Sequence, residues 1–165
     1  MAHRADRRGL IVGDDLSRLA HWAAPLMAGL SVPRRRAAMV QIATYMRRSN
    51  AQRIAEQRNP DGSAYEPRKP RLRAKKGKIR RTMFEKLRQA KHLKKSATAA
   101  SAVLTIAGRS ARIARVHQLG LRDKVDWRRP NSPSVTYPRR ELLGFTEADV
   151  DAITDILLQH INAGA

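Results

Sequence analysis

Phe145-Thr146-Glu147-Ala148-Asp149-Val150, which leads into residues 151–161, is the stretch that most clearly decides the fold. Thr146 can cap a helix, and Asp149 follows three residues later, so the pair predicts a capping box with Asp in place of the usual Glu. Phe145 and Val150 have the spacing of a hydrophobic staple. Apolar residues then recur at helical spacing, and we expect the buried stripe to be Val150, Ile153, Leu157 and Ile161.

Two further helices are predicted at the opposite end of the chain. The first follows Asp14 or Asp15, whose carboxylates can cap it, and it ends at Gly29. The second runs from about Pro33 to Gln57, because proline is tolerated in a first helical turn. We expect an antiparallel helical hairpin. The expected buried stripes are Leu16, Leu19, Ala20, Ala23 and Leu26 in the first helix and Met39, Ile42, Ala43, Met46, Asn50 and Ile54 in the second.

The middle of the chain has strand character. Apolar and polar residues alternate from Ala102 to Ile106, and the segment from Leu93 to Thr98 can pair with it. We also predict short helices at residues 83–90 and 110–119, and another strand at residues 135–137. The fold class is therefore α+β: an N-terminal helical hairpin, a small antiparallel β-sheet, a C-terminal helix and a long basic loop. Residues 1–13 are interpreted as a basic N-terminal arm, and residues 14–165 as one domain.

A strong turn signal, Asn59-Pro60-Asp61-Gly62, opens the predicted loop at about residues 60–82. The loop is dense in Lys and Arg and poor in apolar residues, a composition typical of segments that become ordered on binding. We expect its cations to contact a protein partner or the DNA backbone. They are Arg68, Lys69, Arg71, Arg73, Lys75, Lys76, Lys78, Arg80 and Arg81.

The charge distribution is uneven. The formal net charge of +20 indicates an anionic neighbour, most often nucleic acid. Residues 68–95 contain 14 Lys or Arg and one acid, whereas residues 145–165 contain four acids and no Lys or Arg. A basic middle and an acidic end allow copies to bind head to tail, and such contacts close into rings when the rotation permits. The alternative is that these charges only solvate the surface.

The sequence carries no recognisable catalytic pattern. It lacks a glycine-rich phosphate loop, and no histidine pair at i, i+4 spacing encloses an acid, so neither a nucleotide nor a zinc cofactor is indicated. The absence of cysteine excludes disulfides and thiolate metal ligands. The acids of the last helix are spaced for a helix surface rather than a cleft. No apolar stretch is long enough to span a membrane. His117, beside Gly120, is interpreted as a structural histidine.

Three segments together resemble a known family. They are Ile54-Ala55-Glu56-Gln57-Arg58-Asn59-Pro60-Asp61-Gly62-Ser63 with residues 65–68, then residues 108–121 containing Ala114-Arg115-Val116-His117-Gln118-Leu119-Gly120, and finally Tyr137-Pro138 with Arg140-Glu141-Leu142-Leu143-Gly144-Phe145. In this order they resemble the tail completion protein S family of temperate contractile-tailed phages, also called the virion morphogenesis family. The family-motif positions we single out are Asn59, Pro60, Asp61, Gly62, His117, Gly120, Tyr137 and Pro138.

The resemblance implies a structural virion protein, with no catalytic residues, that completes or terminates the tail and enables head–tail joining. It implies a homo-oligomer, a hexameric ring at the neck around the DNA channel, because contractile tails have sixfold symmetry. The implied partners are tail tube or sheath proteins and head connector proteins, with assembly in the bacterial host cytoplasm. The alternative from charge is a sequence-nonspecific nucleic-acid-binding protein, so whether the basic loop binds protein, DNA or both stays open.

Overall fold

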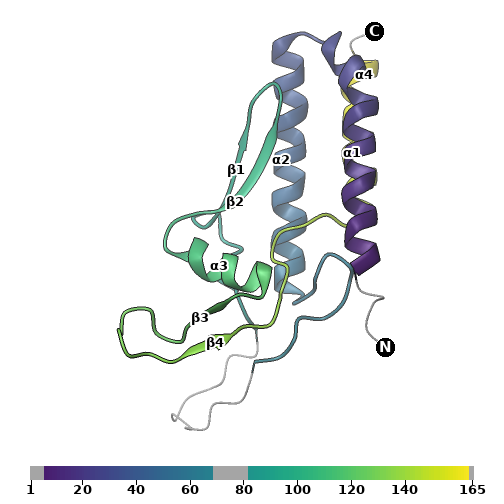
Figure 1. Ribbon diagram of the computed structural model, residues 1–165. Helices are drawn as coiled ribbons and strands as arrows, with labels where there is room; N and C mark the ends of the chain where they lie inside the picture. Colours follow the sequence, from purple (N-terminus) through teal and green to yellow (C-terminus); the bar gives the residue numbers. More distant parts are fainter. Residues whose placement is uncertain (1–5, 69–81, 164–165) are drawn as a thin grey trace.

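Three helices from the two ends of the chain form a bundle. The computed structural model describes residues 6–68 and 82–163, with side chains described from Leu16 onward. Helices α1 (Asp6–Ala28) and α2 (Val32–Ala55) run antiparallel, as predicted, and α4 (Glu147–Asn162) packs against both (Figure 1). The predicted α+β class is confirmed.

Two small antiparallel sheets occupy the middle of the chain. Strands β1 (Leu93–Ala97) and β2 (Ala102–Ile106) pair with Leu93 opposite Ile106, and this hairpin lies along α2 (Figure 1). After α3 (Ser110–Leu119), strands β3 (Arg122–Lys124) and β4 (Ser134–Thr136) form a separate two-stranded sheet. The sequence predicted β4 but not β3, because Arg-Asp-Lys has none of the apolar alternation that marks a strand.

Helix α2 connects two apolar clusters. Its first half helps to build the bundle core, whose buried residues are Ala23, Met27, Ala38, Ile42, Met46, Ile153, Ile156 and Leu157. Its end enters a second cluster beneath β1 and β2, whose buried residues are Ile54, Tyr65, Met83, Leu87, Ala114 and Leu142. The stripe predicted for α2 is confirmed, since Met39 packs against the bundle core and the other five residues are buried.

The start and the buried face of α1 differ from the prediction. The helix begins at Asp6, inside the expected arm, and Asp14 and Asp15 lie within it instead of capping it. Residues 6–13 contain no proline, and an internal glycine costs only about 1 kcal/mol relative to alanine, so no residue there forces a later start. Ala23 and Met27 face the bundle core, whereas Leu26 is 41% exposed.

The helix predicted at residues 83–90 is absent, and consecutive turns replace it. Phe84 has a φ of 62°, in the left-handed region that a bulky residue seldom adopts and that a right-handed helix excludes. The N–H of Leu87 donates to the Phe84 carbonyl at 2.7 Å, which closes a turn. Met83 and Leu87 are buried, whereas Ala90 is exposed.

The capping box of α4 forms as predicted. The Thr146 N–H donates to Asp149 Oδ2 at 2.9 Å, and the Asp149 N–H donates to Thr146 Oγ1 at 3.1 Å. The prediction that the acids of this helix all lie on its surface is wrong for Asp149, which is 1% exposed. The Ser49 hydroxyl of α2 donates to Asp149 Oδ1 at 2.5 Å, so the cap also joins the two helices.

Candidate functional site

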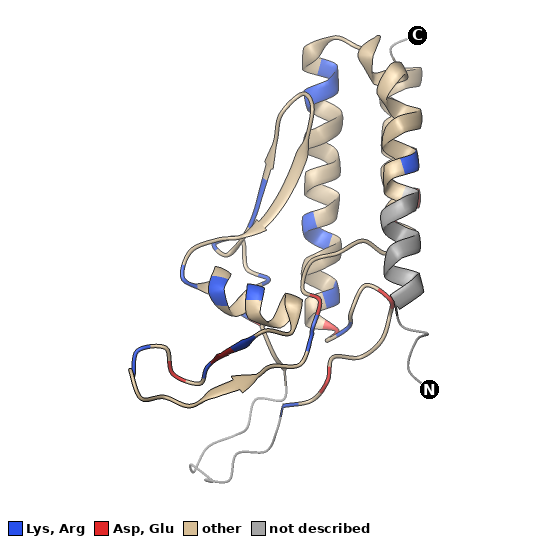
Figure 2. Ribbon diagram, viewed as in Figure 1, with Lys and Arg blue, Asp and Glu red and all other residues tan. Residues whose placement is uncertain are grey.

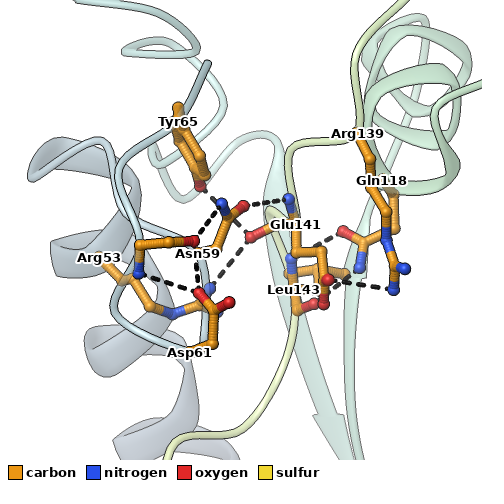
Figure 3. A network of polar contacts seen from close by, with 9 residues as sticks. Arg53, Asn59, Asp61, Tyr65, Gln118, Arg139, Glu141 and Leu143 are labelled. Atoms are coloured by element: carbon orange, nitrogen blue, oxygen red, sulfur yellow. Dashed lines mark hydrogen bonds and ion pairs between the residues drawn. The ribbon is translucent and has the colours of Figure 1, made fainter. Parts of the chain in front are cut away.

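The three family-like segments converge at the lower end of α2, around the extended chain of residues 139–144. We call this convergence the motif junction: residues 50–68, 117–120 and 137–144. Figure 3 shows Arg53, Asn59 and Tyr65 on one side of the extended chain, with Gln118 on the other. The extended chain has no strand partner among the described residues. The Arg140 N–H donates to the His117 carbonyl at 2.7 Å, and side chains hydrogen-bond several of the other peptide groups.

Asn50 and Arg53, both on α2, supply the first set of these contacts. Asn50 is fully buried, and its Oδ1 accepts from the Gly144 N–H at 3.1 Å and from Arg53 Nη2. Arg53 Nη1 donates to the Glu141 carbonyl at 3.0 Å, and its Nη2 lies 3.4 Å from the Leu142 and Gly144 carbonyls. Burial lowers the pKa of the Arg53 guanidinium. The contacts with the Glu141, Leu142 and Gly144 carbonyls make the guanidinium a hydrogen-bond donor to backbone inside the protein.

The Asn59–Gly62 turn supplies the second set. The Gly62 N–H donates to the Asn59 carbonyl at 3.0 Å, and Gly62 has a φ of 82° that favours glycine. Asn59 Oδ1 then accepts from the Glu141 N–H at 2.8 Å. The Tyr65 hydroxyl donates to the Glu141 carbonyl at 3.3 Å, and burial raises the Tyr65 pKa to about 12, which keeps the hydroxyl protonated. The turn thus forms as predicted and anchors residue 141.

Helix α3 supplies the third set through Gln118. Its amide makes a two-bond pair with Leu143, donating to the carbonyl at 2.8 Å and accepting from the N–H at 2.9 Å. Gly120 ends the helix with a φ of 66°, and the chain at Arg139 passes close to it. A Cβ placed on Gly144 would lie 2.4 Å from Pro60 Cγ, so the junction also requires a glycine where the turn meets the extended chain.

Half-buried His117 and buried Arg140 form a pair at the same junction. Arg140 is 3% exposed, and its Nη1 lies 3.0 Å from His117 Nδ1, which we assign as the acceptor. Burial, together with the Arg140 charge, lowers the His117 pKa to about 4. Neutral His117 therefore fills a structural position at neutral pH, in agreement with the interpretation made from the sequence.

Four rings stack edge to face through the junction. Tyr65 and Phe84 lie 6.0 Å apart between ring centroids, Phe84 and His117 lie 4.8 Å apart, and His117 and Tyr137 lie 5.1 Å apart. Such pairs contribute about 0.5–1.5 kcal/mol each beyond the burial of their area. The family-motif residue Tyr137 is therefore a packing contact for His117.

Both ends of the basic loop are attached to this junction. Arg140 Nε donates to the Glu66 carbonyl at 2.8 Å, and its Nη2 donates to the Pro67 carbonyl at 3.2 Å. At the other end, the Gln57 amide donates to the Met83 carbonyl at 2.9 Å and accepts from its N–H at 2.6 Å. Arg68 is exposed at the loop entrance. The other predicted contact residues lie outside the described residues: Lys69, Arg71, Arg73, Lys75, Lys76, Lys78, Arg80 and Arg81.

Asn50 was expected in the buried stripe of α2, and Gln57, Gln118 and Arg140 lie in the family-like segments, but the sequence predicted no hydrogen-bonding role for these residues or for Arg53. One signal was available, because Asn50 interrupts an apolar helical stripe, and a buried polar residue normally has a specific partner. Arg53 and Gln118 offered no comparable signal, since charged and amide residues are ordinary on helix surfaces.

The junction uses its polar groups to hold backbone. Within the described ranges, no group of three or more His, Asp or Glu side chains could hold a metal ion. The helices described there include none that is long and apolar enough to cross a membrane. The polar groups of the site hold in place the backbone at the two ends of the basic loop.

Comparison with known proteins places these features in a family context. Residues 14–162 match the phage virion morphogenesis family. The chain is 37% identical over 138 residues to the tail completion protein S of Escherichia phage P2, an alignment that covers 82% of this chain and 90% of that protein. No solved structure matches the chain significantly.

Proposed function

The chain belongs to the phage virion morphogenesis family, and we propose that it terminates the tail and enables head–tail joining. Family membership assigns it a structural role in the phage tail. The observation that carries the finer proposal is the extent of the similarity, because the alignment covers 90% of a relative named as a tail completion protein. The three segments of the motif junction lie within the matched residues 14–162.

We place the protein in a ring at the neck, with six copies around the DNA channel, in contact with tail tube or sheath proteins and with head connector proteins. The motif junction supports this placement because it fixes both ends of a loop that carries most of the expected contact residues. A loop held at both ends loses less conformational freedom when it binds than a free chain end does. Its cations suit an acidic protein surface or the DNA backbone.

The test is deletion of the gene in its phage, followed by electron microscopy of the lysate. Filled heads beside separate tails, and joined virions when the wild-type chain is supplied from a plasmid, are the expected outcome. Normal joined virions from the deletion phage would refute the proposed function.

A second candidate, sequence-nonspecific nucleic-acid binding, is favoured by the net charge of +20. It predicts that the purified chain binds duplex DNA of any sequence, with an affinity that falls steeply as salt rises. Salt-dependent DNA binding combined with normal head–tail joining in the deletion phage would favour this candidate.

A further inference from the structure

The β3–β4 hairpin projects from the body below α3 (Figure 1). Three apolar side chains of this hairpin are exposed. Val125 and Trp127 are each 58% exposed, and Val135 is 39% exposed. The register places Val135 opposite Asp123, whose carboxylate binds Arg112 of α3. We call this set, Val125, Trp127 and Val135 with Arg112 and Arg128, the hairpin surface. A grouped, exposed apolar patch with a polar rim marks an interaction site more often than chance exposure does.

Two arginines hold Trp127 in place. The Arg112 guanidinium carbon lies 5.9 Å from the ring centroid, and that of Arg128 lies 5.5 Å away. Arg112 itself is oriented by two hydrogen bonds to Asp123, one of them 3.0 Å long. Tryptophan and arginine are the residues most enriched where interfaces concentrate their binding energy, and a held ring loses little freedom on binding.

The chemistry of the hairpin surface favours a protein over nucleic acid. Figure 2 shows acidic residues interspersed with the basic ones in this hairpin. Asp123 pairs with Arg112, and Asp126 pairs with Arg129 at 3.4 Å, so two of the local cations are already neutralised. The exposed valines can form neither a hydrogen bond nor an ion pair with a phosphate backbone. Arg115 and Arg128 form no ion pair within the described part of the chain, which leaves them to attract an acidic apolar surface.

The chain carries such a surface on α4. Glu147, Asp151 and Asp155 recur every four residues, all exposed, and residues 145–165 contain no Lys or Arg. Beside this stripe, a groove of about 320 Å³ lies between α2 and α4, and its walls include Tyr45, Arg48, Asp155 and Ile156. Arg48 can lie against the face of an incoming aromatic ring. The groove therefore combines an apolar lining from Tyr45, Ala152 and Ile156 with an acidic edge at Asp155, and its other lining residues are Gln41, Thr44, Arg48 and Gln159.

We propose that the hairpin surface of one copy docks in the α2–α4 groove of a second copy. Trp127 enters the groove, and Arg128 lies against Asp155 at its edge. The inference rests on the ring proposed above and names the contact between its neighbouring subunits. Because the two surfaces are different parts of the chain, each copy can donate one and accept the other, which is the head-to-tail contact that a ring requires.

Cysteine crosslinking tests this contact directly, because the natural chain contains no cysteine. Asn131→Cys and Gln159→Cys change exposed residues, one in the turn of the β3–β4 hairpin and one on the groove wall, and both leave Arg128 and Asp155 in place. A plasmid supplies the double variant to the deletion phage. Tails isolated from the lysate are then treated with a short bismaleimide crosslinker. We expect a ladder of crosslinked multimers up to a closed ring from the double variant, and no ladder from either single variant.

A charge exchange provides an independent control. Arg128→Asp and Asp155→Arg should each reduce the crosslinked ladder at least about tenfold, the loss typical of an interface hot spot. The two changes combined should restore it. Trp127→Ala should abolish assembly with unchanged circular dichroism, whereas Trp22→Ala, which changes a 45% exposed tryptophan on α1, should not.

The outcomes separate this inference from the proposed function. Joined virions that contain the double cysteine variant without crosslinked chains would overturn the contact and leave the tail role standing. A Trp127→Ala chain that assembles normally but no longer binds duplex DNA would assign the hairpin surface to nucleic acid and would also overturn it. Normal joining without the gene would refute the proposed function itself.

Discussion

Gly144→Ala should destabilise the protein by about 3 kcal/mol, because the motif junction leaves no room for a methyl group. The new Cβ would lie 2.4 Å from Pro60 Cγ, whereas ordinary contacts between carbon atoms begin near 3.4 Å. The Pro60 ring cannot rotate away, so about 1 Å of movement must come from the backbone. Adding a methylene-sized group to a packed site costs about 1–3 kcal/mol.

The hydrogen bonds of Gly144 raise this cost. Its N–H donates to the fully buried Asn50 Oδ1 at 3.1 Å, and its carbonyl lies 3.4 Å from Arg53 Nη2. A shift of about 1 Å weakens both contacts, and a net hydrogen bond contributes about 0.5–1.5 kcal/mol. The sum of the steric and polar parts gives the estimate of about 3 kcal/mol.

The assay is urea unfolding followed by circular dichroism, with Gly29→Ala as the matched control. A Cβ on Gly29 would meet only the Leu26 carbonyl at 3.6 Å, an ordinary contact. That change should leave the free energy of unfolding unchanged or raise it by less than about 1 kcal/mol, because alanine has less freedom than glycine in the unfolded chain.

A double-mutant cycle with Pro60→Ala tests the steric cause. Removing Cγ leaves Cβ as the nearest Pro60 side-chain atom, at 3.2 Å, so Gly144→Ala should cost at least about 1 kcal/mol less in this background. The reasoning is refuted if Gly144→Ala matches Gly29→Ala within about 0.5 kcal/mol, or if its cost is the same with and without Pro60.

Four further predictions concern the cap, the half-buried His117, the bundle core and the loop. Thr146→Ala removes the acceptor for the Asp149 N–H and should lower the free energy of unfolding by about 1 kcal/mol, measured by urea; no change would show that the cap is unimportant. The His117 pKa is about 4 in the folded chain and about 6.5 unfolded, so the unfolded chain binds the extra proton between these values. Stability should therefore be full above about pH 6.5 and fall as the pH drops toward 4, and urea midpoints for His117→Asn should vary less with pH over this window; an equal slope in both proteins would contradict the assignment. Ile153→Asp places a carboxylate where the native side chain is 6% exposed and should prevent folding, because the cost of several kcal/mol is comparable to the whole stability of a small domain; a normal melting curve would contradict the core assignment. Reversal of loop charges should leave the melting temperature unchanged but block head–tail joining in the complementation assay, and normal phage yield would count against the loop's role; the residues to change are Lys75, Lys76, Lys78, Arg80 and Arg81.

The motif junction brings residues of the three family-like segments together, and Asn50, which precedes the first segment, joins them. Asn59 binds residue 141, Gln118 binds residue 143, and Asn50 binds residue 144. A change in any one of them leaves a partly buried peptide group unpaired, and such a loss costs up to about 1–3 kcal/mol. These residues therefore support the loop and do not themselves need to contact a partner.

The sequence by itself determined the elements whose cause is local. The capping box at Thr146 and Asp149, the apolar stripe of α2 and the alternation of β2 each depend on residues within a few positions, so periodicity and capping chemistry predict them. The Asn59–Gly62 turn is equally local, because its glycine adopts a φ of 82°. The α+β class followed from the order of these elements.

The tertiary structure alone decided which polar residues are buried and where the short elements end. Asp149 is buried because Ser49 of α2 meets it, and Phe84 takes a left-handed conformation beside Met83, whose backbone is held by Gln57. Strand β3 forms beside an ion pair to α3, although its own sequence predicts no strand. Each of these outcomes depends on partners that come together only when the chain has folded, and local propensities of a fraction of a kcal/mol cannot outweigh such contacts.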